Sequence, residues 1–167
     1  MTIVFRFRLD QVKNRKDREF LQRQFKKWEI NEKHPIELEQ QTIDQIITLQ
    51  GVSSADEGAK LLVQWADKLG AIFKATGLTS SQIRNFFGEI RSIQQQDFAK
   101  DSTRRRFILL LPKVQYAAAR ANKPGMYGFR DVLTASIETV ADDPDNFKRF
   151  SEFFEAILAY HRAYGGK

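Results

Sequence analysis

Positive charge concentrates between Ser102 and Arg130. This stretch holds seven Lys or Arg residues and no Asp or Glu. Aromatic residues lie among the basic ones, including Tyr116 and Tyr127. A folded domain that gathers unbalanced positive charge and aromatic rings in this way is typical of a surface that binds a polyanion. The alternative is a solvated helix face whose charge is neutralised by carboxylates from elsewhere in the fold.

The charge of the whole chain alternates in four blocks. The net charge is +6 over 167 residues. Residues 1–35 and 102–130 contribute +5 and +7, whereas residues 36–101 and 131–167 contribute −3 each. The positive charge is therefore concentrated in two basic blocks, and mildly acidic blocks alternate with them.

The sequence offers little for catalysis. Cysteine is absent, which excludes disulfides, thiolate catalysis and Cys-ligated zinc and fits a reducing, cytoplasmic location. His34 and His161 lie in no zinc-binding spacing, and we expect each to be a surface or helix-end residue. The acidic run at residues 142–145 lacks the ligand spacing of a calcium loop and is expected to cap a helix. With no phosphate-loop or nucleophile-turn motif either, we expect a protein that is not an enzyme and holds no metal or cofactor.

The N-terminal residues alternate in a way that predicts a short strand. Phe5, Phe7 and Leu9 would share one side of an extended segment over residues 3–9, with Arg6 and Arg8 on the other. A single strand is not stable alone, so this arm either pairs with a neighbour or packs as a tail. Charges interrupt this stretch, which is not a signal-peptide pattern, and no segment approaches the ~18 apolar residues of a membrane helix.

Helical periodicity dominates the rest of the chain. Capping signals at residues 54–57, 79–82 and 143–144 mark three helix starts. Pro112 should kink or break its helix, and the turn chemistry of residues 123–128 predicts a loop. The sequence thus predicts an all-α domain, a compact bundle of about five to seven helices with a short extended N-terminal arm. The predicted helices cover residues 15–30, 36–50, 54–77, 79–98, 103–122, 129–141 and 143–164.

Two pairs of basic residues share a seven-residue spacing. Arg84 and Arg91 lie two turns apart on one predicted helix, and Lys113 and Arg120 repeat the spacing on the next. Two turns advance about 10.5 Å, which suits two contacts along a nucleic-acid backbone. The alternative for Arg84 and Arg91 is a solvent face paired with acids such as Glu89.

Gly88 lies between the two arginines of the first pair. A glycine inside a helix costs about 1 kcal/mol relative to alanine. Such a cost suggests that something approaches the helix closely at this point. We expect another helix there in preference to a ligand backbone.

Two segments resemble the signatures of a known family. Residues 78–91, with the sequence LTSSQIRNFFGEIR, look like the central signature of the small subunit of type III-A CRISPR effector complexes (the Csm small-subunit family). Residues 110–120, with the sequence LLPKVQYAAAR, resemble the second signature of that family. The order and separation of the two also match, and the resemblance covers about residues 57–165. We therefore expect an N-terminal extension with a basic helix over residues 1–53 and a helical small-subunit domain over residues 54–167.

The resemblance implies a subunit that has no enzymatic activity and no cofactor. Copies of such subunits stack in a filament beside guide RNA and captured target RNA in antiviral defence, together with other effector subunits, one of which cuts the target. Because base pairing supplies sequence specificity, backbone contacts from Lys and Arg suffice. The resemblance suggests Arg84, Arg91, Lys113 and Arg120 as RNA-binding residues, and charge alone adds Lys74, Arg104, Arg105 and Lys123.

Other functions stay open on the sequence. A helical adaptor that binds an acidic protein partner would use the same basic block, and a nuclease-insensitive pull-down would favour it. A DNA-binding domain is a third candidate, although no helix-turn-helix spacing is present. Arg106 is expected to point away from its basic neighbours, because three successive helical residues cannot share a face.

Overall fold

Side-chain caps begin three of the long helices. The computed structural model describes residues 1–167. Thr79 and Gln82 form a complete capping box at the start of α4 (Ser80–Gln94), and Asp143 caps α8 (Pro144–Ala163) by accepting from two backbone N–H groups. At α3 (Ala55–Ala75), Ser54 accepts from the N–H of Glu57, whose carboxylate instead accepts from the preceding serine. These signals are local, and the starts that they predict are confirmed.

The remaining elements complete a mostly α-helical chain with an extended N-terminal arm, as predicted, and the arm forms part of a small two-stranded sheet. Five further helices and two strands are present, together with a short 3-10 turn at Leu9–Gln11. Their bounds are β1 (Ile3–Phe7), α1 (Arg15–Lys27), β2 (Ile36–Glu39), α2 (Gln40–Ile47), α5 (Asp101–Ile108), α6 (Leu110–Ala121) and α7 (Pro124–Val140). No helix combines the length and the apolar character needed to cross a membrane.

The N-terminal strand pairs with a segment that the sequence suggested was helical. β1 and β2 run antiparallel, with Phe7 opposite Ile36 and an ion pair of 3.0 Å between Arg6 and Glu37. The predicted helix over residues 36–50 is therefore wrong for its first four residues, and α2 begins only at Gln40. The reason is long-range: ladder bonds to β1 satisfy this backbone, and alternate side chains of β2 enter the core.

Two other boundaries differ from the prediction near the basic stretch. The predicted break is confirmed, but it lies at Leu109, between α5 and α6, so that Pro112 sits in the first turn of α6 where its missing N–H is tolerated. The predicted loop over residues 123–128 is wrong, because Pro124 occupies the first turn of α7. Gly128 lies within α7, and glycine is needed there for close packing, because a Cβ would meet the Phe5 ring at 2.7 Å.

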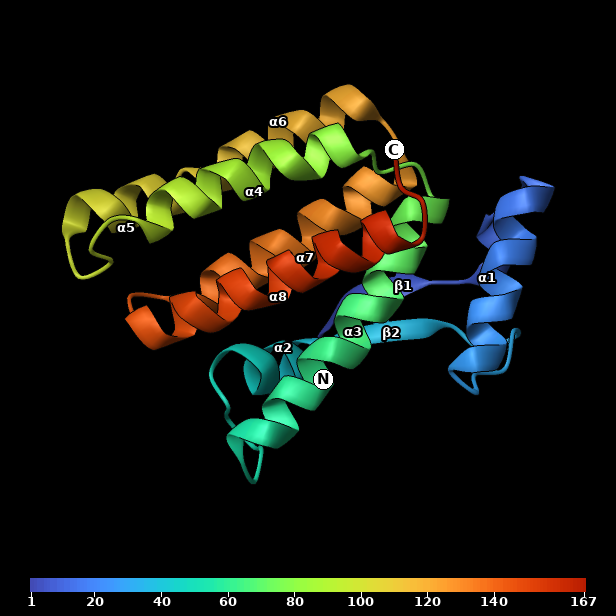
Figure 1. Cartoon of the computed structure of the whole chain (residues 1–167), viewed down its shortest axis with the longest axis horizontal. Coiled ribbons are helices and arrows are strands. Elements are labelled where there is room, and N and C mark those ends of the chain that lie inside the picture. Colours follow the sequence, from blue (N-terminus) through green and yellow to red (C-terminus); the bar gives the residue numbers. More distant parts are fainter.

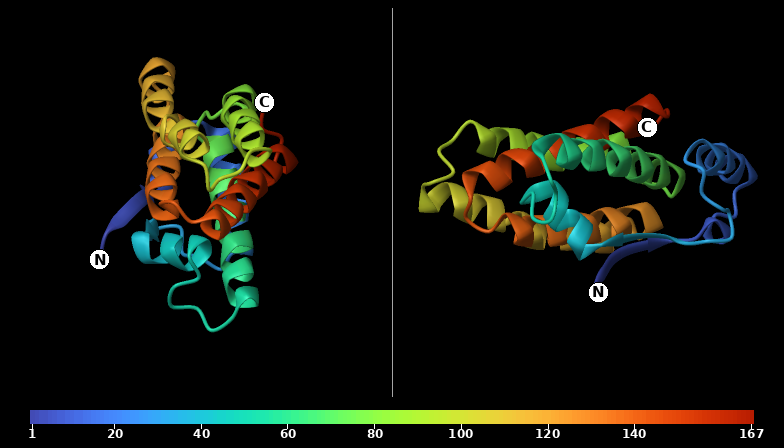
Figure 2. Two further views of the ribbon diagram at one scale, coloured as in Figure 1. Left: turned by 90° about the vertical axis from the view of Figure 1, so that its left-hand side faces the viewer. Right: turned by 90° about the horizontal axis from the view of Figure 1, so that it is seen from below.

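The four helices α4, α6, α7 and α8 run beside one another as a bundle (Figure 1). Seen from the side in Figure 2, left, α7 and α8 lie below α6 and α4, and α3 passes along α8 toward α2. The contact of α3 with α8 is close, since a Cβ on Gly70 would come within 2.9 Å of the backbone nitrogen of His161. The chain end returns to the start of α4, where Ser80 N–H donates to the Lys167 carbonyl at 2.6 Å.

One cluster of 40 buried apolar residues joins the N-terminal segment to the bundle. Phe5 of β1 meets Phe73 of α3 edge to face, and Phe73 meets Phe129 of α7 in the same way. Phe7 meets Phe25 of α1 with ring centroids 6.4 Å apart. Residues of β1 and α1 therefore share the core of the helices that follow.

Polar contacts hold the end of α1 against α3 and the end of α8. Lys27 Nζ donates to the Tyr164 hydroxyl at 2.6 Å and lies 3.4 Å from Asp67. Asp67 also accepts from the Trp28 indole N–H at 3.0 Å and from the Tyr164 hydroxyl. Burial, followed by the hydrogen bond to Asp67, raises the pKa of Tyr164 above its usual value, so the phenol stays protonated and keeps donating.

Candidate nucleic-acid interface

Helix α4 presents basic side chains on the flank beside its buried stripe. Its apolar residues, from Ile83 to Ile93, enter the core at helical spacing. Arg84 and Arg91 lie on the exposed part of the helix surface. Arg91 reaches across to Glu155 of α8 at 3.7 Å and stacks its guanidinium over the Phe87 ring, whereas Arg84 has no carboxylate partner. Because the two arginines are seven residues apart, both occupy the flank of α4 that faces α8.

The second pair lies on the flank of α6 that faces α4. Lys113 and Arg120 are exposed, and the Lys113 Nζ lies 3.7 Å from the Glu89 carboxylate on α4. Arg120 repeats the position of Lys113 two turns later and has no carboxylate partner. Glu89 therefore lies on the flank of α4 that faces α6, which is the flank opposite Arg84 and Arg91. The structure therefore brings the two basic pairs to either side of the outer face of α4.

Glu89 is the acidic group of this surface. It accepts a hydrogen bond of 2.9 Å from the Arg106 Nε. This bond, assisted by the nearby Lys113, holds the pKa of Glu89 below its usual value despite partial desolvation. The carboxylate stays ionised and cancels part of the positive charge, and Arg106 points toward it, away from its basic neighbours.

Gly88 lies between the two basic pairs with its backbone open to solvent. A Cβ built on Gly88 would meet no atom within 4 Å. The expectation that another helix of the chain packs on this glycine is therefore wrong. Neither packing nor a turn explains a glycine in the middle of α4, and a side chain at this position would have free space in the isolated chain.

Four basic residues were expected on charge alone, and the structure places Arg104 and Arg105 apart from Lys74 and Lys123. Arg104 donates to the backbone carbonyls of Phe98 and Ala99, at 3.2 and 2.6 Å, and pairs with Asp101, so it closes the turn before α5. Arg105 is exposed and has no ion-pair partner. Lys74 and Lys123 lie at the end of α3 and the start of α7, beside a cleft.

Some features were not accessible to sequence reasoning. Lys13 lies in the same cleft as Lys74 and Lys123, but only its charge distinguishes it in the sequence, because segments far apart in the chain form the cleft. His161 lies in the last turn of α8, a helix end as expected, but it is fully buried, with Nε2 2.6 Å from the Leu78 carbonyl oxygen. Burial lowers the pKa of this histidine, so it is held neutral.

A metal site needs several His, Asp or Glu side chains close together. No group of three or more His, Asp or Glu side chains is arranged to hold a metal ion. Asp143, in the acidic run, caps α8 as expected, accepting from the N–H groups of Asp145 and Asn146 at 2.8 and 3.1 Å. The chemical capacity of the α4–α6 surface is therefore electrostatic, with arginine and lysine side chains around an open helix backbone.

Comparison with known proteins agrees with the two signature segments on α4 and α6. No curated protein and no solved structure matches the chain. Residues 56–167 match the family model for Csm2 of type III-A, which spans α3 to α8 and includes both basic pairs. The chain therefore belongs to the Csm2 family, the structural small subunits of type III-A CRISPR effector complexes.

Proposed function

We propose that this chain is a non-catalytic subunit that holds the backbone of guide and target RNA on its α4–α6 surface. It does so in the cytoplasm, as part of antiviral defence, within an effector complex whose other subunits cut the target. The observation that carries the proposal is the pair of exposed arginines without carboxylate partners, Arg84 and Arg120, on either side of the bare backbone at Gly88.

Charge and shape both suit a backbone ligand. Phosphates need only positive side chains, and the exposed Arg84, Lys113 and Arg120 supply them, so the proposal requires no contact with a base edge. A helix with a glycine in its outer face lets a strand approach closer than any side chain would allow. The cost of Gly88 to helix stability is then explained by contact with the ligand.

Stacking of copies needs a second kind of surface. Ile108 and Tyr116 are 53% and 64% exposed, and Leu109 beside them is 44% exposed. Exposed apolar side chains gathered on α5 and α6 are typical of protein contact. We propose that copies stack head to tail, with the acidic block of residues 131–167 meeting a basic block of the next copy.

The same apolar group is the observation that favours the second candidate function. An adaptor that binds an acidic protein partner would use Ile108, Leu109 and Tyr116 for apolar contact and Arg105 for charge. Its signature is capture of a protein partner that persists after nuclease treatment. RNA binding that depends on Arg84 contradicts it, because Arg84 lies on the α8 flank of α4 and away from this group.

A fluorescence-anisotropy titration with single-stranded RNA of unrelated sequences tests the RNA proposal. The variant with Arg84→Ala and Lys113→Ala should bind at least about tenfold more weakly, equivalent to about 1.4 kcal/mol, with unchanged helicity by circular dichroism. Each lost phosphate contact should also reduce the slope of log K against log salt by about 0.7.

The matched control removes two exposed lysines elsewhere. Lys60 on α3 and Lys148 on α8 have no ion-pair partners, so the variant with Lys60→Ala and Lys148→Ala loses the same formal charge. It should keep wild-type affinity. Equal affinity of wild type and of the Arg84/Lys113 variant would contradict the assignment of the interface.

A further inference from the structure

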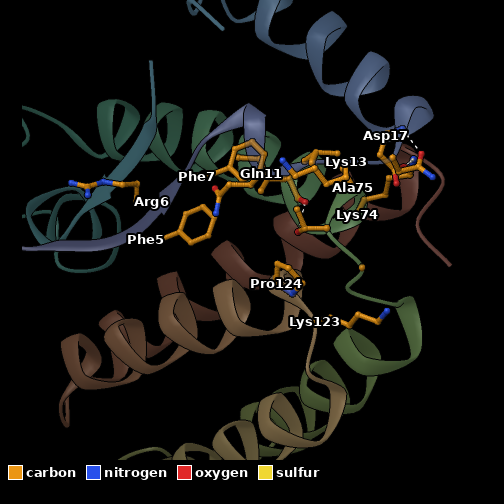
Figure 3. Close-up of a pocket in the computed structure, with 15 residues that line it drawn as sticks. Phe5, Arg6, Phe7, Gln11, Lys13, Asp17, Lys74, Ala75, Lys123 and Pro124 are labelled. Carbon is orange, nitrogen blue, oxygen red and sulfur yellow. Dashed lines mark hydrogen bonds and ion pairs between the residues drawn. The ribbon is translucent and has the colours of Figure 1, made fainter. Parts of the chain in front are cut away.

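A cleft of about 640 Å³ lies where the N-terminal segment meets the bundle (Figure 3). Its walls come from residues 5–14, from the last turn of α3 with Gly77, and from Lys123 and Pro124. Buried apolar side chains, including Phe5 and Ile72, form its floor. The volume lies within the range of about 300–1,000 Å³ that small-molecule sites occupy.

Three lysines give this cleft its charge. Lys13 and Lys74 lie on one wall, and Lys123 lies on the opposite wall (Figure 3). Asp17 is the single carboxylate among the lining residues, and Lys74 Nζ is 4.0 Å from it. Lys13 and Lys123 are exposed and have no carboxylate partner. Lys13 Nζ donates to the backbone carbonyl of Asp10 at 3.2 Å, so two ammonium groups on facing walls have no counter-charge and keep donors for an anion, while the third is shared with Asp17.

Other polar groups of the walls are donors rather than acids. Arg6 also lines the cleft, although its guanidinium pairs with Glu37 of β2 at 3.0 Å. The backbone N–H groups of Gly77 and Lys123 donate no hydrogen bond within the chain. Gln11 adds a side-chain amide among the lining residues. Free N–H donors together with unpaired ammonium groups suit a phosphate oxygen.

We propose that this cleft binds a phosphate group, carried either by a phosphodiester of single-stranded RNA or by a free nucleotide. In the RNA case the inference rests on the proposed function and extends it. Lys123 follows Arg120 by three residues, so the cleft opens near the end of the α6 surface. One wall comes from residues 5–14, which precede the segment that matches the family model, so this site combines an extension with the small-subunit helices.

Amide NMR of the full chain, titrated in turn with AMP and with a short oligouridylate that lacks a terminal phosphate, tests the proposal. Amide signals of Lys13, Gly77 and Lys123 should shift on binding. The variant with Lys13→Gln and Lys123→Gln should bind at least about tenfold more weakly, equivalent to about 1.4 kcal/mol. The variant with Lys60→Gln and Lys148→Gln, which loses the same charge away from the cleft, should bind like wild type.

The two probes separate the sources of the phosphate. Shifts in the cleft with the oligouridylate alone identify an RNA backbone, and shifts with AMP identify a site open to free nucleotides. Shifts at Arg84 and Arg120 with none in the cleft overturn the cleft and leave the proposed function standing. Unchanged affinity of the Lys13/Lys123 variant also overturns it, and silence at both surfaces overturns both proposals.

Discussion

Substitutions at Gly88 should change the stability of the chain and its RNA affinity in opposite directions. Alanine is favoured over glycine inside a helix by about 1 kcal/mol, and a Cβ at this position meets no atom within 4 Å. Gly88→Ala should therefore stabilise the isolated chain by nearly that amount. For a chain of 167 residues, this corresponds to a rise in melting temperature of about 2–4 °C.

RNA binding should change in the other direction as the side chain grows. If a strand passes close to the backbone at Gly88, glutamine at this position displaces it from at least one of the flanking cations. A hydrogen bond to a charged group contributes about 1.5–3 kcal/mol, so loss of one such contact corresponds to at least tenfold weaker binding. Gly88→Ala should lie between wild type and Gly88→Gln in affinity.

Calorimetry and anisotropy titration on the same preparations measure the two effects. Ala59→Gln is the matched control, because it adds the same side chain at an exposed position of α3, away from both basic pairs. Wild-type affinity of Gly88→Gln would refute the reasoning, since it would show that no ligand comes close to this backbone. A lower melting temperature for Gly88→Ala would show instead that the glycine serves the fold.

Three further predictions concern the fold and the assembly. Tyr164→Phe removes the hydroxyl that joins Lys27 to Asp67, so it should lower the free energy of unfolding by about 1–2 kcal/mol in urea denaturation. An unchanged urea concentration at the unfolding midpoint would contradict the role of this contact. Burial lowers the pKa of His161, so the unfolded state binds more protons than the folded state as pH drops below about 6.5, the usual pKa of histidine. The melting temperature should therefore fall as pH drops through this value, and it should fall less in His161→Gln. The double substitution Glu138→Lys with Glu152→Lys reverses charge in the acidic block of residues 131–167. Native mass spectrometry of the assembled complex should then show a changed number of copies, whereas the RNA affinity of the isolated chain should stay the same. An unchanged copy number counts against head-to-tail charge pairing.

The fold was predictable where its signals are local. The capping signals at residues 54–57, 79–82 and 143–144 lie within single turns, and their helices begin where the sequence indicates. β2 was not predictable in this way, because its four residues take their conformation from a ladder with β1, whose paired residues lie 29 to 36 positions earlier in the chain. Residues 124–128 were misassigned because a Pro-Gly pair indicates a turn, although proline is also common in the first turn of a helix, where it lies here.

The candidate site was predictable as a set of residue types but not as a surface. Spacing placed Arg84 with Arg91 and Lys113 with Arg120, and the structure keeps each pair on one helix flank. The partners were hidden, because Glu89 lies near Arg84 in sequence but faces Lys113 and Arg106 in space. Contacts between remote segments decide which cations are free, and periodicity carries no information about them.

The number of free cations bears on how tightly one copy can bind. Of the seven basic residues between Ser102 and Arg130, Arg104, Arg106 and Arg130 pair with carboxylates. Glu89, with its pKa held below the usual value by Arg106, also cancels part of the charge of Lys113. Few phosphate contacts per copy imply weak binding by the isolated chain, with a slope of log K against log salt of about 0.7 for each contact.

Weak single-copy binding is compatible with firm retention of RNA in a complex. Copies that sit side by side on one strand each raise the effective concentration of the next contact, so affinity grows steeply with copy number although no contact is strong. Titration of RNAs of increasing length with the isolated chain should therefore show affinity that rises with length and remains salt-sensitive throughout. Tight binding of one copy to a short RNA, independent of salt, would contradict both the count of free cations and the tandem arrangement.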